Sequence, residues 1–554
     1  MIKIKRLYMM IVMVTTLFFT QASSEEKAYE YHEVASTVMI NALRAQPENS
    51  FLKKLYTQLL FVPVWMNEDD PSPAANALFE YVKNDPTLDK EDKLYQDLLG
   101  LEKEVHSVYA NHEKLTHKID LEFKISQFYK VYTDYAYLGS INWGAFQARI
   151  SNLIVNDVST EWILHRPQFN AIVMLENTAL GADLVKELEK NTPKKYHYRE
   201  LQKKVSEYRE IKANGGWEPV TLNETLKPGK SSNGVPSLRQ RLIVTRDYVP
   251  CEESNEDLVY DECLQKAVKY FQRRNGLADD GEVGPNTLTV LNKTVDERIQ
   301  TILLNLDRIK WLNDPKTKRH IIINIPDFML YFEQDGALIQ TFRTIVGTPK
   351  NPTPIFSNSV KTIVLNPQWN VPKSIIQKEY IPKLLRNSNV LRKEKIEVYN
   401  GWGRDAVKVN PASVNWAAYR YSKTVPYRFA QTAGTHNALG KVKFLFPNKF
   451  SVYMHDTPTK HLFKKDKRAF SHGCIRLQKP RELLETFSTF EETVDFEKSQ
   501  KILKGKKKKY LPLEERVPID VIYLTAWVDY DGQLQFRNDV YHYDEMQLKS
   551  FKKW

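Results

Sequence analysis

The spacing of apolar residues changes along the chain, and this change constrains the fold more than any other feature. From about residue 29 to residue 212 they recur at three- and four-residue intervals, which predicts helices. From His320 onward they fall into short alternating runs bounded by turn signals, which predicts strands. A chain of 554 residues also exceeds what one hydrophobic core usually organises. The sequence therefore predicts a multidomain α+β protein.

The predicted helical part divides into two units. Residues 29–212 contain prolines that mark turns between helices but no cluster of reactive side chains, so we expect a scaffold. Residues 213–235 are rich in glycine, proline and serine, a composition typical of a linker. Residues 236–295 follow as a compact helical unit, with glycines placed to end helices and form turns.

A β-rich domain is expected at residues 318–498. Residues 374–443 interrupt its strand pattern with polar, aromatic and proline-marked sequence. Long insertions in compact domains are usually functional or disordered, so we expect a mobile lid there. Residues 499–554 are predicted to form a basic segment and a β-hairpin, turning at Asp531-Gly532, that packs on the β-rich domain.

The first 24 residues have the order of a secretory signal peptide. Lys3, Lys5 and Arg6 precede an apolar run from Leu7 to Phe19, and small residues follow it. The apolar run is shorter than the ~20 residues that cross a bilayer, which disfavours the alternative of a retained membrane anchor. We therefore expect residues 1–24 to be removed and the protein to be exported.

Export places the three cysteines, Cys251, Cys263 and Cys474, where disulfides persist. Cys251 and Cys263 flank a short acidic loop and are the natural pair, which leaves Cys474 as a free thiol. The net charge of +12 favours anionic surroundings. Nucleic acid is an improbable partner outside the cytoplasm, whereas cell-wall polymer, an anionic membrane surface and a merely solvated basic surface all stay open.

Cys474 lies in a sequence with the parts that a cysteine nucleophile needs: a base, oxyanion donors and a tight turn. Gly473 permits a sharp turn, so the amides of Gly473 and Cys474 could face an oxyanion, and His472 and His455 are candidate bases. Arg476 could bind a carboxylate, support the thiolate or form a surface ion pair. The bland alternatives are a buried thiol or a zinc ligand, but the surroundings are polar and the histidine spacings match no standard metal pattern, so we expect no metal.

The segment from Ser471 to Leu477, Ser-His-Gly-Cys-Ile-Arg-Leu, preceded by Tyr-Met-His-Asp-Thr at Tyr453 to Thr457, resembles the active site of the YkuD-like L,D-transpeptidases. Residues 236–295 resemble the three-helix peptidoglycan-binding domain, with its alanine-valine, phenylalanine-glutamine and asparagine-glycine-leucine signature. Together with a helical scaffold and an interrupted catalytic domain, these motifs are similar to the large Gram-negative type of the family.

The resemblance implies roles for individual residues. Cys474 would be the nucleophile and His455 the general base and acid, with its ring oriented by a backbone carbonyl. His472 and Gly473 would shape the oxyanion site together with Arg476. Tyr453 would contact substrate, and the insertion would carry Trp402 and Trp416 over it as parts of the lid.

The expected function is therefore an exported, periplasmic L,D-transpeptidase that needs no cofactor. It would link diaminopimelate residues of peptidoglycan stem peptides through a cysteine thioester and release D-alanine. Its expected partners are the stem peptides and other cell-wall synthases, and not nucleic acid. The open alternatives are a non-catalytic cell-wall-binding protein, an L,D-carboxypeptidase and an enzyme of lipoprotein attachment.

Overall fold

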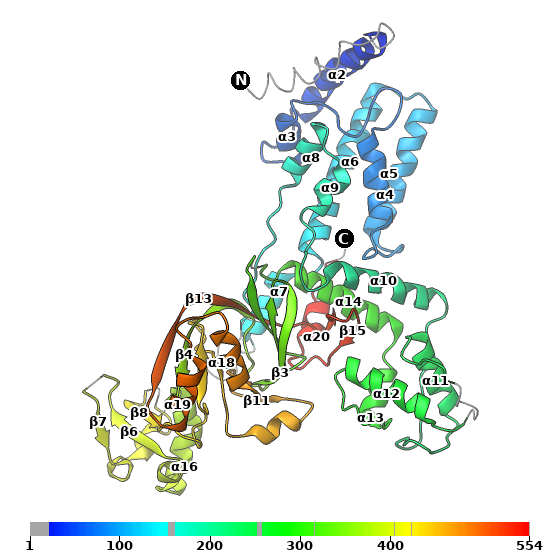
Figure 1. Cartoon of the computed structure of the whole chain (residues 1–554). Coiled ribbons are helices and arrows are strands. Elements are labelled where there is room, and N and C mark those ends of the chain that lie inside the picture. The colour runs from blue at the N-terminus through cyan, green and yellow to red at the C-terminus, as the bar shows by residue number, and fades with distance from the viewer. Residues whose placement is uncertain are drawn as a thin grey trace.

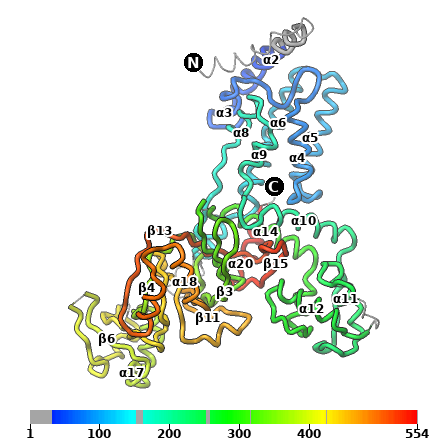
Figure 2. Tube along the Cα trace, in the orientation of Figure 1, coloured from blue at the N-terminus to red at the C-terminus, as the bar shows by residue number. Residues whose placement is uncertain are grey.

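The computed structural model describes residues 22–152, 161–251, 258–314, 316–403, 405–422, 424–552 and 554. The signal peptide predicted at residues 1–24 lies outside the described residues except for its last three positions. A helical lobe stands at one end of the molecule, and a β-rich lobe and a small helical unit lie side by side at the other (Figures 1 and 2). Within the described ranges, no helix is long and apolar enough to cross a membrane.

The helical lobe packs around one apolar core, which α6 traverses as its longest helix. Serine, asparagine and aspartate side chains cap several of its helices by accepting backbone N–H bonds, which explains where these helices begin. The helices of this region are α2 (Ala22–Leu43), α3 (Phe51–Gln58), α4 (Pro73–Lys83), α5 (Lys93–Ala110), α6 (Leu115–Leu138), α7 (Trp143–Asn152), α8 (Ala171–Ala179) and α9 (Leu184–Glu189). Of these, α7 packs into the core of the β-rich lobe.

Two helices of 16 residues each, α10 (Tyr198–Ala213) and α14 (Val295–Lys310), pack against each other. Along the chain, α10 precedes the small helical unit and α14 follows it. That unit contains α11 (Val235–Val244), α12 (Glu262–Arg274) and α13 (Pro285–Leu291). Residues 213–235, predicted as a linker, are not a loose connection between two units. Their residues Val220 and Leu226 are buried in the core of the small helical unit. Leu226 also pairs through its backbone with Val283.

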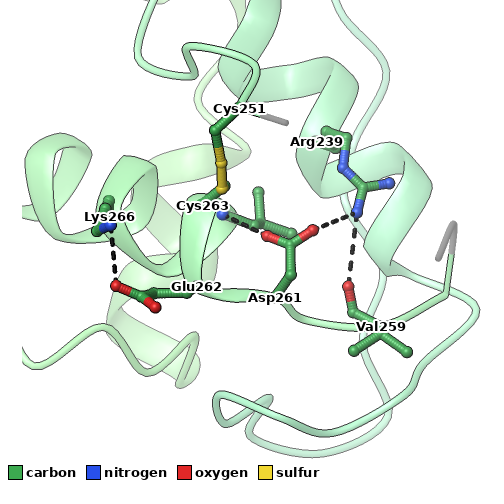
Figure 3. Close-up of a disulfide and its surroundings, with 8 residues drawn as sticks. Arg239, Cys251, Val259, Asp261, Glu262, Cys263 and Lys266 are labelled. Carbon is green, nitrogen blue, oxygen red and sulfur yellow. Dashed lines mark hydrogen bonds and ion pairs between the residues drawn. A yellow bond between two sulfur atoms is a disulfide. The ribbon is translucent and has the colours of Figure 1, made fainter. Parts of the chain in front are cut away.

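A disulfide joins Cys251 to Cys263 in the first turn of α12, which confirms the predicted pairing (Figure 3). Asp261 caps the same helix by accepting the Leu264 N–H at 2.7 Å, and it also pairs with Arg239 of α11 at 3.3 Å. The disulfide and the ion pair together tie the loop before α12 to the helical unit.

The β-rich lobe contains a nine-stranded sheet in the order β11-β3-β12-β10-β9-β4-β13-β1-β2. Because β2 also pairs with β3, the sheet closes on itself like a barrel around a large apolar core. Its strands are β1 (Arg319–Asn324), β2 (Met329–Gln334), β3 (Ala337–Gly347), β4 (Phe356–Leu365), β9 (Val442–Leu445), β10 (Met454–His455), β11 (Ala469–Ser471), β12 (Ile475–Leu477) and β13 (Lys509–Ile522). The helices α18 (Pro480–Ser488) and α19 (Phe496–Lys504) pack against it.

The predicted insertion, together with residues 369–373 before it, folds as a small subdomain with its own apolar core at the far edge of this lobe. Its four-stranded sheet has the order β5-β8-β6-β7. Its elements are β5 (Trp369–Asn370), α15 (Lys373–Ile375), a π-helical turn (Ile376–Tyr380), α16 (Ile381–Arg386), α17 (Val390–Lys393), β6 (Ile396–Asn400), β7 (Val407–Val409), 3-10 turns (Pro411–Ser413 and Trp416–Tyr419) and β8 (Tyr427–Gln431). The last two residues of the predicted insertion, Val442 and Lys443, belong to β9 of the main sheet.

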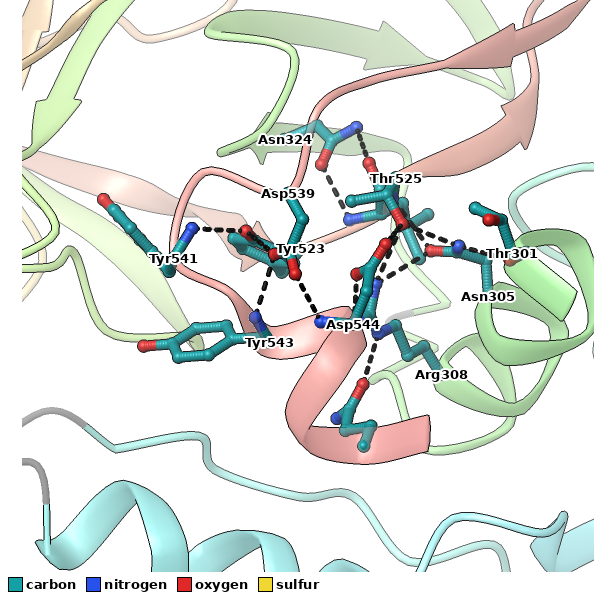
Figure 4. A network of polar contacts seen from close by, with 12 residues as sticks. Thr301, Asn305, Arg308, Asn324, Tyr523, Thr525, Asp539, Tyr541, Tyr543 and Asp544 are labelled. Carbon is teal, nitrogen blue, oxygen red and sulfur yellow. Dashed lines mark hydrogen bonds and ion pairs between the residues drawn. The ribbon is translucent and has the colours of Figure 1, made fainter. Parts of the chain in front are cut away.

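The chain after residue 499 does more than pack a hairpin on the β-rich lobe, because it also supplies a strand of the main sheet. Its strand β13 sits between β1 and β4 in the main sheet, and only then come the hairpin β14 (Ala526–Val528) and β15 (Leu534–Phe536) and the helix α20 (Tyr543–Leu548). The buried Arg308 of α14 donates to Asp544 and Gln547 of α20, both at 2.7 Å (Figure 4). The C-terminal segment thereby connects the main sheet to α14.

Candidate active site

Three adjacent strands of the main sheet set the geometry of the candidate site. His455 on β10 is the register partner of Lys443 on β9 and of Arg476 on β12. Side chains of register partners lie on the same face of a sheet, so these three form a row across it. Tyr453 lies two residues before His455 and belongs to the same face, with 5.6 Å between the two ring centres.

Cys474 stands directly before β12 and beside Tyr453, because the next residue, Ile475, donates its N–H to the Tyr453 carbonyl at 3.1 Å. Gly473 precedes it with φ of +100°, a left-handed conformation that favours glycine. Ser471 Oγ accepts the Gly473 N–H at 3.1 Å and donates to the Cys474 carbonyl at 2.6 Å. Thr353 Oγ1 donates to the Gly473 carbonyl at 2.9 Å, so hydrogen bonds hold both ends of this turn.

The Cys474 thiol is half-buried, and its Sγ lies 3.9 Å from the Ser451 carbonyl oxygen. Burial raises the pKa of the thiol, while hydrogen bonds from Tyr453 and the positive charges of Lys443 and Arg476 act in the opposite direction. The site therefore holds the sulfur in a partly dry setting with donors and cations around it. Such surroundings suit a nucleophile better than an inert core thiol.

His455 is 3% exposed, and its Nδ1–H donates to the Asp456 carbonyl oxygen at 2.5 Å. A carbonyl can only accept, so this bond fixes the hydrogen on Nδ1 and leaves the lone pair on Nε2. Burial, followed by the charges of Arg476, Lys443 and Lys460, lowers the pKa of His455 to about 3. The imidazole is therefore neutral at physiological pH and available as a proton acceptor.

The structure places the other predicted oxyanion residues around the cysteine turn. His472 is exposed, and its Nε2 lies 2.9 Å from Glu379 Oε1 in the π-helical turn of the insertion. The Gly473 N–H donates to Ser471 Oγ, so in this conformation it is not free to donate to an oxyanion, the role that the sequence suggested for it. Arg476 is half-buried, and its Nη1 donates to Thr459 Oγ1 at 3.3 Å.

The two predicted lid tryptophans have different environments. Trp402 is 52% exposed, so it is accessible on the insertion. Trp416 is only 6% exposed and packs against Tyr427 and Phe429 in the core of the insertion, with its Nε1–H donated to the Pro411 carbonyl. Contact between substrate and Trp416 would require this core to open, so its expected substrate-binding role is not supported by its position.

Sequence reasoning assigned no role to Lys443 or Thr353, and it gave none to Ser471 although this residue begins the quoted motif. The two hydroxyl residues hold the turn, and Lys443 approaches the ring of Tyr453 with 3.5 Å between Nζ and the ring centre. The alternation in Lys441, Val442, Lys443 and Phe444 predicts a strand, but only the pairing of β9 with β10 shows that Lys443 lies beside His455.

Three protein-family descriptions match the chain. Residues 318–495 match the L,D-transpeptidase catalytic domain (YkuD), residues 50–205 match the scaffold domain, and residues 231–291 match the "Putative peptidoglycan binding domain". The two resemblances seen in the sequence, to a YkuD catalytic domain and to a peptidoglycan-binding domain, are therefore confirmed.

A curated relative, the "Putative L,D-transpeptidase" of Haemophilus influenzae, is 32% identical over 245 residues, which are 44% of this chain and 48% of the relative. The match thus spans about half of the relative's length. The L,D-transpeptidase of Stackebrandtia nassauensis is a structural neighbour at 14% identity and a TM-score of 0.22, with 55% of this chain and 97% of that chain covered. The L,D-transpeptidase from Mycobacterium smegmatis follows at 14% identity and a TM-score of 0.17, with 37% and 58% covered. The resemblance rests on the matched domain descriptions and the sequence relative.

Proposed function

We propose, from the match of residues 318–495 to the L,D-transpeptidase catalytic domain (YkuD), that the protein cross-links peptidoglycan through an acyl-enzyme on Cys474. The observation that carries the proposal is the placement of Cys474 and His455. The thiol stands at the start of β12 and the neutral imidazole on the adjacent strand β10. A thiol and a base of fixed tautomer, carried on adjacent strands of one sheet, are the two groups that nucleophilic acyl transfer requires.

In the first half-reaction, Cys474 Sγ attacks the carbonyl carbon of the third stem residue, diaminopimelate. The thiol proton passes to His455 Nε2 as the sulfur–carbon bond forms. The tetrahedral intermediate then expels terminal D-alanine, whose amine takes the proton back from His455, and a thioester remains on Cys474. The hydrogen bond from His455 Nδ1–H to the Asp456 carbonyl keeps Nε2 oriented through both transfers.

In the second half-reaction, the side-chain amine of a diaminopimelate on another stem attacks the thioester. His455 Nε2 accepts a proton from this amine, and the departing thiolate of Cys474 takes it up. The product is an amide between two third-position residues. Water in place of the amine gives an L,D-carboxypeptidase, and a protein amine gives a lipoprotein attachment.

The proposed oxyanion donor is one backbone N–H and not the pair from Gly473 and Cys474 that the sequence suggested. Because the Gly473 N–H is held by Ser471 Oγ, the N–H of Cys474 itself is the better candidate in this conformation. A change at Gly473 would still disturb the site, since the residue has φ of +100° and a side chain there would strain the turn.

Substrate supply and location follow from the other domains. We propose that residues 231–291 hold the enzyme on peptidoglycan and that the chain works in the periplasm after export, where other cell-wall synthases are its partners. The disulfide between Cys251 and Cys263 is consistent with an oxidising compartment.

Incubation of the purified protein with a disaccharide tetrapeptide tests the proposal. We expect release of D-alanine together with cross-linked dimers, both followed by liquid chromatography and mass spectrometry. Tripeptide without dimer would make the protein a carboxypeptidase. Binding to isolated peptidoglycan without D-alanine release would identify a cell-wall-binding protein and contradict the proposal.

A further inference from the structure

One cation beside the thiol has no part in the reaction described above. Lys443 of β9 is half-buried, and its Nζ lies 3.5 Å from the centre of the Tyr453 ring. Tyr453 in turn lies opposite Cys474 and is hydrogen-bonded to its sulfur. The ring thus supports the ammonium on the face of the sheet that carries the thiol.

The charged groups around this face come from several elements. His455 lies between Lys443 of β9 and Arg476 of β12, and Lys460 is the third cation that acts on it. The Asp456 carboxylate pairs with Lys460 at 2.6 Å and accepts the N–H groups of Lys441 and Thr457. The Glu379 carboxylate of the insertion pairs with His472. Both carboxylates are therefore engaged by groups other than Lys443.

This charge distribution determines which group can balance a thiolate. In many cysteine enzymes the partner of the thiolate is a protonated histidine. Here burial and neighbouring cations lower the pKa of His455 to about 3, so His455 carries the thiol proton only in passing to the D-alanine amine and is not a lasting imidazolium partner of the thiolate. Lys443 retains most of its charge near pH 7, because burial lowers its pKa only to about 8 and the negative charge of Cys474 acts to raise it.

Building on the proposed transpeptidase function, we propose that Lys443 is the counter-ion of the Cys474 thiolate, seated on the ring of Tyr453. When the thiol proton leaves for His455 Nε2, the negative charge on Sγ lies in the field of the Lys443 ammonium. When the sulfur–carbon bond forms, this charge moves to the carbonyl oxygen, and it returns to Sγ as the thioester is resolved. Lys443 keeps its protons throughout.

The pH dependence of Cys474 alkylation by iodoacetamide tests this role on the mature protein without any peptide substrate. In Lys443→Met we expect the midpoint of the alkylation profile to rise by roughly one pH unit, with about a tenfold slower reaction at pH 7. Lys443→Arg keeps the charge but cannot titrate in this range, so its midpoint should stay near that of the wild type.

Lys508→Met is the matched control. It also removes one positive charge and one cation–π contact, with Tyr510, but it lies just before β13, which three strands separate from β12. Its alkylation profile should equal that of the wild type. Thermal melting of each variant checks folding, and Lys443→Gln replaces the methionine variant if that variant is unstable.

Two results would overturn the proposal. An unchanged midpoint in folded Lys443→Met or Lys443→Gln would show that the ammonium does not support the thiolate, even if KM for the stem peptide rises. If the alkylation midpoint rises as much in Lys443→Arg as in Lys443→Met, Lys443 would act as a proton carrier and not as a counter-ion. Failure of the proposed function appears separately, as wild-type protein that is alkylated normally but releases no D-alanine.

Discussion

His472 Nε2 and Glu379 Oε1 lie 2.9 Å apart and connect the cysteine turn to the π-helical turn of the insertion. The two residues are remote in sequence, and their contact joins the turn that carries the nucleophile to the subdomain expected to cover the substrate. The π-helical geometry is itself uncommon and recurs at functional sites. We therefore expect this contact, called the latch contact below, to help hold the insertion against the cysteine turn.

We predict that Glu379→Gln loosens the insertion. An exposed contact of this kind contributes at most about 1 kcal/mol, so the overall melting temperature should barely change, while amide exchange over residues 376–386 should become faster. Acylation of Cys474 should slow exchange in the same residues if the insertion closes over the thioester. Hydrogen–deuterium exchange with mass spectrometry measures both effects.

Lys408→Gln is the control for the latch contact, because it breaks the 2.8 Å ion pair between Lys408 and Glu397 within the insertion and leaves the cysteine turn untouched. Exchange over residues 376–386 should then match that of the wild type. Equal protection with and without an acyl group in the wild type would show that the insertion is a static part of the fold.

Cys474→Ala should abolish release of D-alanine and covalent labelling by a carbapenem. The thiol is half-buried and no other free cysteine occurs in the sequence, so no second thiol can replace it. The fold should survive, since alanine removes one sulfur from a turn that is held by Ser471 and Thr353. Intact-mass spectrometry and circular dichroism check both points. D-alanine release at the wild-type rate would refute the nucleophile assignment.

His455→Gln should slow both half-reactions by the ~10²–10⁴-fold typical of a lost general base, with binding to peptidoglycan retained. It should also flatten the acid dependence of stability. The pKa of His455 is about 3 in the folded protein, well below its ordinary value near 6.5. The unfolded chain therefore binds the extra proton first, and stability falls as the pH drops from about 6.5 toward 3.

Urea unfolding at several values between pH 7 and pH 4 measures this second effect. The difference in unfolding free energy between pH 7 and pH 4 should be smaller in His455→Gln than in the wild type. The same pH dependence in both proteins would mean that His455 is not held neutral by its surroundings.

The local motif and the architecture were within reach of the sequence, while contacts between strands were not. Cys474, Gly473 and His472 are contiguous, and His455 lies within the motif from Tyr453 to Thr457, so residue types alone could nominate them. Lys443 could not be nominated, because its position beside His455 depends on the register between β9 and β10. Periodicity also cannot show that Trp416 faces inward, since an aromatic residue suits both a core and a lid.

The C-terminal segment illustrates the same limit on a larger scale. The predicted hairpin across Asp531-Gly532 forms as β14 paired with β15, but the sequence did not predict β13, which pairs in parallel with β1 and antiparallel with β4. Partners so distant along the chain leave no local signal. The burial of Val220 in the predicted linker is similar, because glycine and proline mark irregular backbone and do not tell whether it packs on a core.

Replacing both Cys251 and Cys263 by serine should destabilise the small helical unit. The disulfide closes a loop of 12 residues, for which chain entropy predicts a contribution of about 3 kcal/mol. Binding to isolated peptidoglycan should weaken at elevated temperature, whereas alkylation of Cys474 should not change. A melting curve of the variant identical to that of the wild type would contradict the prediction.

Glu122→Gln should destabilise the helical lobe. Glu122 on α6 is fully buried, and its carboxylate accepts the backbone N–H groups of Val64, Trp65 and Met66 at 2.7–3.0 Å and the Tyr56 hydroxyl at 2.8 Å. A glutamine would turn an NH₂ group toward some of these donors, so buried N–H groups would lose their acceptor, at a cost of about 2 kcal/mol. The exposed Glu104, paired with Lys124, gives the matched control, and Glu104→Gln should change stability by less than about 0.5 kcal/mol. Equal urea midpoints for the two variants would show that the Glu122 carboxylate does not hold the loop between α3 and α4 in place.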